Sequence, residues 1–157
     1  MTPAIDQVKK AKVAFTIHQY QHDSACQSYG LEAAEKLNIP AKQVFKTLVL
    51  KLDAKQLVVA ILPVDTKLSM KSVAKACGGR KAEMADKVEV QRSTGYVLGG
   101  VSPLGQKKSL QTIIDGSAQQ YPTIYVSGGR RGLEIELPAL DLQTLTLALF
   151  APISQLS

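Results

Sequence analysis

The chain has 157 residues, of which 45% are hydrophobic and 20% charged, and 19 Lys and Arg residues against 13 Asp and Glu residues give a net charge of +6. This length is typical of one domain with a substantial core, and the composition excludes a disordered chain. No apolar run approaches the roughly 20 residues that cross a bilayer. We therefore expect a single domain over residues 1–157, without membrane association.

The N-terminal part of the chain predicts a helix, a strand and a second helix. Thr2 before Pro3 indicates a helix start, with the hydroxyl as N-cap and proline at the first position. The β-branched and aromatic residues of "VAFTIHQY" (13–20) predict a strand. The segment "LEAAEKL" (31–37) predicts a short helix that ends before the asparagine and proline of "NIP".

The middle of the chain predicts a β-hairpin followed by a helix. The segments "QVFKTLVLKL" (43–52) and "QLVVAILPV" (56–64) predict strands joined by a tight turn at "DAK" (53–55). A helix over 69–76 is expected next, closed by Gly78.

The remaining elements are predicted from shorter signals. A further helix is expected in "KAEMADKVEV" (81–90), and "TGYVL" (94–98) resembles a strand. The segments "PTIYVSGG" (122–129) and "GLEIELP" (132–138) predict a second hairpin. Asp141 is expected to cap a final helix whose inward residues are Leu142, Leu145 and Leu149. Because strands do not alternate regularly with helices, the predicted fold is mixed α/β, close to α+β, with a largely antiparallel sheet.

Lys46 lies within a predicted strand whose two faces are both mainly apolar. It shares one face with Leu48 and Leu50, while Phe45 and Val49 point the other way. Such a strand is expected to be central and covered on both sides. Burying an ammonium group there lowers its pKa or requires an anion. The alternative is a strand-end lysine with a buried stem and a solvated head.

The excess of basic residues is concentrated in a few places. Lys67, Lys71 and Lys75 recur every four residues, a spacing that would place them on one helical face. The pairs Lys107-Lys108 and Arg130-Arg131 flank two glycine-rich turns. Basic clusters favour polyanions through phosphate contacts and counterion release, although a solvated surface explains the lysine spacing equally well.

Several kinds of chemistry lack support in the sequence. His18, His22, Cys26 and Cys77 do not have zinc-site spacings, and no pattern places a thiol beside a base. There is no Walker motif, GxGxxG, HEXXH or GXSXG segment. The two cysteines form no disulfide framework, and the N-terminus lacks the apolar core of a signal peptide. We expect a cytoplasmic protein without a metal or cofactor.

Three segments together carry a family resemblance. In order and spacing, "FKTLVLK" (45–51), "GGVSPLG" (99–105) and "SGGRRGLEIEL" (127–137) resemble the YbaK family of freestanding editing proteins, which are relatives of the editing domain of bacterial prolyl-tRNA synthetase. The likeness covers essentially the whole chain and is greatest to the Cys-tRNA(Pro) deacylases. It implies a mixed, mostly antiparallel sheet, partly closed like a barrel and surrounded by helices.

The uncharged turn "GGVSPLG" matches the GXXXP loop of this family, which faces the pocket for the aminoacylated 3′ end of tRNA. The loop runs here from Gly99 to Pro103. Glycine lets the backbone approach a ligand closely, and proline fixes one flank of the turn. The N–H groups of Gly100, Val101 and Ser102 are candidate donors to the ester carbonyl or its oxyanion. A turn without chemistry is the alternative.

The resemblance also implies the remaining site residues. Lys46 matches the family's essential lysine, with Thr47 beside it, and its expected role is electrostatic positioning. Tyr20 and Tyr29 are candidate pocket walls that stack on adenine or the aminoacyl group, although core packing explains them equally well. Glu134 is the candidate partner of the substrate ammonium group. The second turn supplies further binding residues: Ser127, Gly128, Gly129 and Arg130.

The implied reaction is substrate-assisted. The thiol of the bound cysteine attacks its own ester and releases tRNA and a thiolactone, so the protein needs to orient and desolvate only. The implied partners are the tRNA acceptor end and prolyl-tRNA synthetase. Cys-tRNA(Cys) carries the same cysteinyl ester, so the same reaction can act on it. Two alternatives stay open: an Ala-tRNA(Pro) deacylase of the same fold, and a non-catalytic module that binds tRNA or the synthetase.

Overall fold

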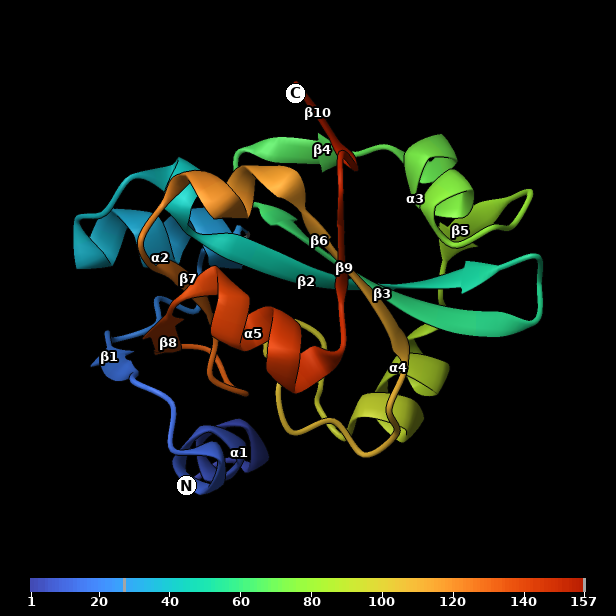
Figure 1. Cartoon of the computed structure of the whole chain (residues 1–157). Helices are drawn as coiled ribbons and strands as arrows, with labels where there is room; N and C mark the ends of the chain where they lie inside the picture. The colour runs from blue at the N-terminus through green and yellow to red at the C-terminus, as the bar shows by residue number, and fades with distance from the viewer. Residues whose placement is uncertain (27, 157) are drawn as a thin grey trace.

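The computed structural model describes residues 1–26 and 28–156 of the chain (Figure 1). Its helices are α1 (Pro3–Ala11), α2 (Tyr29–Leu37), α3 (Met70–Ala76), α4 (Lys87–Thr94) and α5 (Ala139–Thr146), with 3₁₀ turns η1 (Ala41–Gln43) and η2 (Gly116–Gln120). Its strands are β1 (Thr16–Gln19), β2 (Phe45–Leu52), β3 (Gln56–Pro63), β4 (Thr66–Leu68), β5 (Ala82–Met84), β6 (Gln111–Asp115), β7 (Ile124–Ser127), β8 (Leu133–Leu137), β9 (Leu149–Ala151) and β10 (Ser154–Leu156). Within these two ranges, no helix is long and apolar enough to cross a membrane.

The strands form a five-stranded sheet in the order β5-β2-β3-β6-β9, a three-stranded sheet β1-β8-β7 and a two-stranded sheet β10-β4. The pairs β3-β6 and β6-β9 are parallel, and the others are antiparallel. A parallel bridge between Val44 and Tyr125 joins the two larger sheets beside the start of β2. The mixed, mostly antiparallel fold is therefore confirmed, and the sheets adjoin without closing into a barrel.

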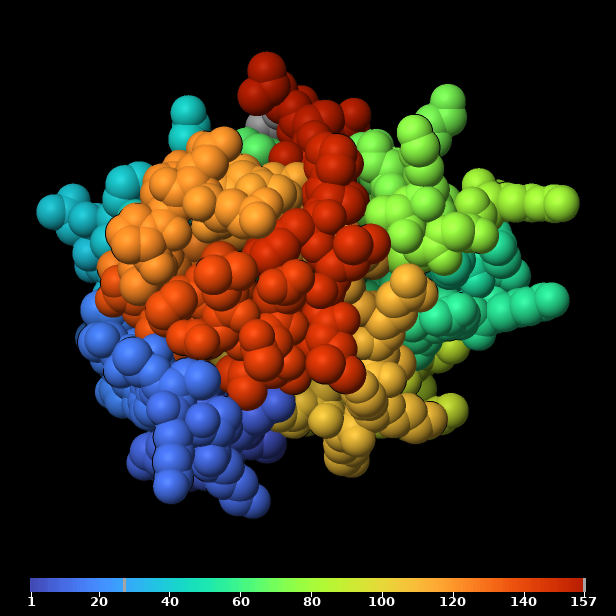
Figure 2. Space-filling view, in the orientation of Figure 1, coloured from blue at the N-terminus to red at the C-terminus, as the bar shows by residue number. Residues whose placement is uncertain are grey.

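The two faces of β2 and β3 are buried in different hydrophobic clusters. Val49 and Ile61 belong to a large cluster that includes residues of α1, α5 and the three-stranded sheet. Leu50 and Ala60 belong to a second cluster with α3. In Figure 1, α5 lies beside the five-stranded sheet, and Figure 2 shows α5 at the surface on this side of the molecule. The prediction of a central strand covered on both sides is confirmed, and Lys46 lies at one end of it.

Local capping signals explain most helix boundaries. The Thr2 hydroxyl accepts the N–H of Ile5, and Pro3 opens α1 as predicted. Asn38 ends α2 in the left-handed conformation that asparagine tolerates well. The Ser69 hydroxyl caps α3. The two predicted hairpins form as β2-β3 and β7-β8.

Two predictions for residues 81–98 are wrong because of pairing and capping. Residues 82–84 form β5, which pairs with β2, and the helix expected over 81–90 begins only after Asp86 accepts the N–H of Val88. That helix continues to Thr94 and ends at Gly95, whose φ is +84°. The segment 94–98 is therefore a helix end and a turn, not a strand.

Three further predictions are wrong because of where the helices and strands begin and end. The last helix follows Pro138 rather than Asp141. It ends at Leu147 with a left-handed φ of 56°, so Leu149 starts β9 and is 48% exposed rather than facing inward. Lys67 lies on β4, so only Lys71 and Lys75 share a helix.

Asp115 anchors the C-terminal strand to the main sheet. Its carboxylate is buried and accepts the N–H groups of Ile153 at 2.9 Å and Ser154 at 3.0 Å, together with the hydroxyl of Ser117 at 2.6 Å. Ser154 opens β10, which pairs with β4 from Leu68 to Thr66. One buried carboxylate thus fixes the strand pair that adjoins the start of β2.

Replacing Asp115 by alanine should lower the free energy of unfolding by about 2–4 kcal/mol, because two buried N–H groups lose their acceptor. Urea denaturation monitored by circular dichroism measures this change. The control Asp141→Ala, in the first turn of α5, should cost less than about 1 kcal/mol. Equal effects of the two substitutions would contradict the anchoring role.

Candidate active site

One cavity, of about 320 Å³, gathers most of the site residues expected from the sequence. It lies between the start of β2, the N-terminus of α2, the turn at 98–101 and the β7-β8 hairpin. Nine expected residues line it: Tyr20, Tyr29, Lys46, Thr47, Gly99, Val101, Ser127, Arg130 and Glu134. Four segments distant in sequence therefore meet around one space.

The remaining five expected residues lie outside this lining. Ser102 is fully buried, and its hydroxyl accepts the N–H of Leu104. Pro103 lines a different cavity, beside Lys107 and Lys108. Gly100, Gly128 and Gly129 lie within the two turns that support the cavity wall, and the Gly128 carbonyl accepts the Thr2 hydroxyl.

Lys46 is held in place by a main-chain oxygen. Its half-buried Nζ donates to the Thr66 carbonyl at 2.7 Å. Burial lowers the pKa of the ammonium group, and the negative charge of Asp65 opposes this in part. An ammonium group has three donors, so Lys46 can contact Thr66 and an oxygen of a ligand together. The expectation of a lysine whose partial burial lowers its pKa is met by this geometry.

Glu134 is a buried acid at the floor of the cavity. It lies on β8 between His18 of β1 and Ser127 of β7 and is 7% exposed. Burial raises its pKa to about 8. Within residues 1–26 and 28–156, no hydrogen bond or ion pair engages its carboxyl group. Glu134 is therefore largely protonated at neutral pH, and a cation in the cavity would favour its ionisation.

Tyr20 borders the same buried acid. Burial raises the pKa of its phenol to about 12, and the charge of Glu134 adds to this shift. Tyr20 therefore stays a neutral hydrogen-bond donor across the physiological range. Thr47 supplies a second neutral polar group. Its buried hydroxyl has no hydrogen-bond partner among the described residues, so it is available to a ligand.

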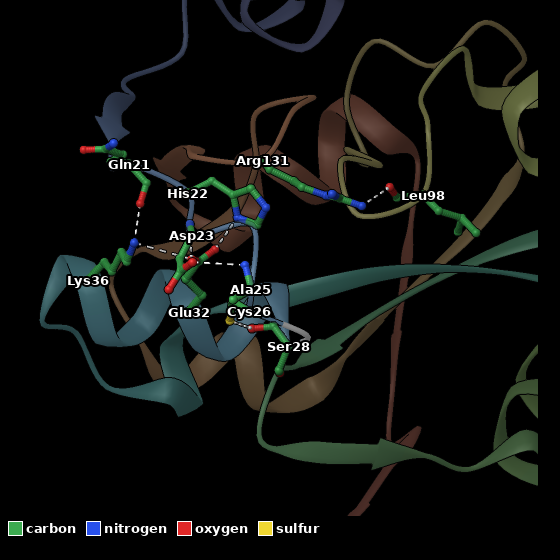
Figure 3. A network of polar contacts seen from close by, with 10 residues as sticks. All are labelled: Gln21, His22, Asp23, Ala25, Cys26, Ser28, Glu32, Lys36, Leu98 and Arg131. Carbon is green, nitrogen blue, oxygen red and sulfur yellow. Dashed lines mark hydrogen bonds and ion pairs between the residues drawn. The ribbon is translucent and has the colours of Figure 1, made fainter.

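The turn after α4 is fixed by Arg131, which the sequence analysis named only as part of a basic pair. The guanidinium lies 3.9 Å from the centre of the Tyr29 ring. It also donates to the Leu98 carbonyl at 3.2 Å, a bond that Figure 3 shows. Gly99 has a φ of +87°, and a Cβ there would lie 2.5 Å from Nε of Arg131. Glycine is required at position 99 by both its conformation and this close approach.

The three candidate N–H donors of the turn differ in availability. The N–H of Gly100 already donates to the Val97 carbonyl at 3.0 Å, which closes the turn. Among the described residues, the N–H of Val101 has no acceptor, and Val101 lines the cavity. Val101 is thus the better placed of the expected donors, and Gly100 is structural.

A buried acid also fixes the segment that leads into α2. Glu32 accepts the Asp23 N–H at 2.7 Å and contacts Nδ1 of His22 at 2.7 Å, with Lys36 at 3.5 Å (Figure 3). Burial raises the pKa of Glu32, but the Asp23 and His22 contacts outweigh this effect and lower it overall. The His22 ring also packs edge-on against Tyr29. Through these contacts Glu32 positions one wall of the cavity.

The structure adds lining residues that sequence reasoning missed: Ser28, Gly30, Val44, Phe45, Leu48, Val64, Leu98 and Arg131. Most of these residues are apolar or small, so their own residue types give no signal of a site. The one available signal is that they adjoin expected site residues in sequence. In the described parts of the chain, no three His, Cys, Asp or Glu side chains converge as metal ligands.

Comparison with known proteins shows the family of this chain. Residues 25–145 match the model of the aminoacyl-tRNA editing domain. The chain belongs to this editing-domain family. EbsC of Enterococcus faecalis, named as a candidate Cys-tRNA(Pro)/Cys-tRNA(Cys) deacylase, is 38% identical over 98% of this chain and 93% of that protein. The family resemblance inferred from the three sequence segments is confirmed.

Two further relatives show how the domain is used elsewhere. A proline–tRNA ligase of Brachyspira hyodysenteriae is 23% identical over 74% of this chain, which corresponds to 23% of the ligase. The crystal structure of a candidate trans-editing enzyme for prolyl-tRNA synthetase has a TM-score of 0.83 and 22% identity, covering 99% of both chains. The fold therefore occurs both as a freestanding chain and as a segment of a longer enzyme.

Replacing Glu134 by glutamine should stabilise the protein at pH 7 by an amount on the order of 3 kcal/mol, because the pKa rises from 4.5 to about 8 on folding. Above pH 4.5 the folded protein retains a proton that the unfolded chain loses, so stability falls with rising pH. At pH 4 the two proteins should be nearly equally stable. Urea denaturation at both pH values measures the difference.

Glu136 provides the matched control on the same strand. His18 and Thr123 contact its carboxylate at 2.8 and 2.6 Å and, despite burial, lower its pKa. The ionised Glu136 carboxylate therefore stabilises the folded protein above the pKa of the unfolded chain, and this stabilisation is lost as the pH falls. Glu136→Gln should accordingly destabilise the protein at pH 7. Equal signs for the two variants would contradict the assignment of Glu134 as a protonated buried acid.

Replacing Gly99 by alanine should displace Arg131 from Tyr29 and lower the free energy of unfolding by about 1–3 kcal/mol. Gly78→Ala is the control, since Gly78 has a φ of +74° but open space around it. Denaturation measures the cost of each, and the NMR signal of the Arg131 Nε–H reports its position. A shift of that signal in both variants would argue against the close contact at Gly99.

Proposed function

We propose that this protein removes cysteine from Cys-tRNA(Pro) in trans, by a reaction in which the substrate supplies its own nucleophile. The single observation that carries this proposal is that one small cavity is lined by both Lys46 and Glu134, two groups whose charged forms burial disfavours. An aminoacyl ester has a cationic ammonium group and a polarisable carbonyl, which complement these two residues. The named activity of EbsC supports the choice of amino acid and tRNA.

Each lining residue has a defined task in this proposal. Glu134 gives up its proton and pairs with the ammonium group of the bound cysteine. Lys46 stabilises negative charge that develops on the ester carbonyl, and the Val101 N–H donates to the same oxygen. Tyr20 and Tyr29 pack against the terminal adenosine or the aminoacyl group. The unpartnered Thr47 hydroxyl contacts the ribose.

The chemistry needs no protein nucleophile. The cysteine sulfur forms a C–S bond to the carbonyl carbon, the ester C–O bond breaks, and the thiol proton ends on the ribose oxygen. Among the described residues, the cavity lining contains no His or Cys side chain. Orientation within a partly buried site is the protein's contribution. Esters of alanine and proline have no thiol, so the reaction itself discriminates between substrates.

Partners and location follow from the same proposal. Cys-tRNA(Cys) carries the same ester and is a second substrate unless another protein supplies the tRNA selectivity. Prolyl-tRNA synthetase is the proposed partner for that step, supported by the presence of a related segment within a proline–tRNA ligase. Translation places this activity in the cytoplasm.

The deciding experiment follows ester loss from Cys-tRNA(Pro), Ala-tRNA(Pro) and Pro-tRNA(Pro) with the wild-type protein and with Lys46→Ala. Only the cysteinyl ester should be lost, and Lys46→Ala should lower kcat/KM about 10²-fold or more because carbonyl stabilisation is removed. Lys42→Ala, an exposed lysine just before β2, should retain activity. Loss of the alanyl ester instead would indicate water-mediated editing, and no loss would indicate a binding module.

The product distinguishes the route. An added amine should capture the thiolactone in reactions with the protein, above the level seen without it. Release of free cysteine with no capturable thiolactone would contradict substrate assistance while leaving the deacylase activity intact.

A further inference from the structure

A second cavity adjoins the first across the turn at Gly99 and Gly100. It is a surface groove of about 430 Å³, lined by Lys87, Gln91, Val97, Leu98, Gly100, Arg130 and Arg131. Leu98, Arg130 and Arg131 line both cavities. We call Arg131, which lies in both linings and contacts Tyr29 and Leu98, the ridge between them; Figure 3 shows its bond to Leu98. A flexible ligand can therefore lie in the groove and cross this ridge into the first cavity.

The groove carries an uncompensated positive charge. Its described lining contains three cations, from Lys87, Arg130 and Arg131, and no Asp or Glu. The two acidic residues nearest to Lys87 in sequence already have partners outside the groove lining. Asp86 accepts the N–H of Val88 at the start of α4, and Glu89 pairs with Lys51 at 2.9 Å. A ligand with closely spaced negative charges fits this lining.

The groove also exposes apolar surface beside its cations. Val97 and Leu98 are 59% and 47% exposed, although both are large hydrophobic residues. Gln91 adds an exposed amide from the second turn of α4. A positively charged groove that follows a phosphate backbone and also contacts the bases is typical of single-stranded nucleic-acid binding. Here the base contacts would come from the aliphatic side chains of Val97 and Leu98 and the amide of Gln91.

We propose that this groove binds the unpaired nucleotides that precede the terminal adenosine of the tRNA 3′ end. Lys87 and Arg130 contact their phosphates, Val97 and Leu98 contact the base faces, and the strand crosses the Arg131 ridge so that the ester enters the first cavity. This inference rests on the proposed deacylase function. It adds Lys87 and Gln91 of α4 to the binding surface. These two residues lie outside the three segments that carry the family resemblance.

The experiment compares a substrate that contains these nucleotides with one that lacks them. One is an acceptor-stem minihelix charged with cysteine on its single-stranded CCA end, and the other is 3′-O-cysteinyl adenosine. Lys87→Gln should raise KM for the minihelix by about three- to tenfold and reduce its log–log salt slope by about 0.7, the loss expected for one phosphate contact. It should leave KM for the adenosine ester unchanged. Lys81→Gln, at an exposed lysine outside both cavities, should change neither.

A second variant tests the apolar contact. Val97→Ser should raise KM for the minihelix without changing its salt slope, and again leave the adenosine ester unaffected. Unchanged minihelix kinetics in both variants, or equal changes for both substrates, would overturn the groove assignment while the wild-type activity still supported the deacylase function. If the wild-type protein cleaved neither cysteinyl ester, the proposed function itself would fail, and this inference with it.

Discussion

The hydrogen bond from Lys46 to the Thr66 carbonyl connects the candidate chemistry to the rest of the fold. An ammonium group on a strand between two apolar clusters needs an oxygen partner, and β4 supplies one at 2.7 Å. The position of β4 depends on its pairing with β10, and β10 is anchored by Asp115. The C-terminal strand therefore acts on the site without touching it. Loss of β10 would remove the strand that pairs with β4 at the residue whose carbonyl Lys46 contacts.

The cavity places two groups of opposite charge type where burial opposes both charges. The pKa of Lys46 is lowered and that of Glu134 is raised. The empty site therefore carries less charge than its residue types suggest, while an entering ammonium group and a polarised carbonyl restore the charged forms. Such a site favours a ligand that brings both features over one that brings a single charge.

Sequence reasoning located the cavity because the recognisable segments also build its walls. Lys46, Gly99 and Ser127 are each part of a short pattern of strand or turn residues, and such patterns are local. Arg131 was missed as a site residue because its role depends on two partners that are distant in the chain. The Tyr29 ring is about a hundred residues away, and the Leu98 carbonyl is 33 residues away. Long-range contacts of this kind leave no local signal.

The same limit explains the errors in the fold. The β5 strand exists because β2 offers an edge to pair with, and no periodicity in 82–84 indicates this. The N–H of Gly100 was a reasonable donor from sequence alone, yet closing the turn on Val97 consumes it. The helix boundaries predicted at Thr2 and Asn38 are confirmed because a cap depends on only a few neighbouring residues, whereas the cap predicted at Asp141 is wrong because α5 already begins after Pro138.

The proposed chemistry and the shape of the site support each other. If the substrate's own thiol performs the attack, the pocket need not exclude small side chains sterically, and a cavity of about 320 Å³ is sufficient. Affinity must then come from elsewhere, because a loosely enclosing pocket contributes few contacts. The basic groove beyond Arg131 is the nearest surface that can supply it. The groove then supplies affinity for the phosphate backbone, which all tRNAs share. The cavity supplies selectivity, because only an ester with an internal nucleophile reacts there.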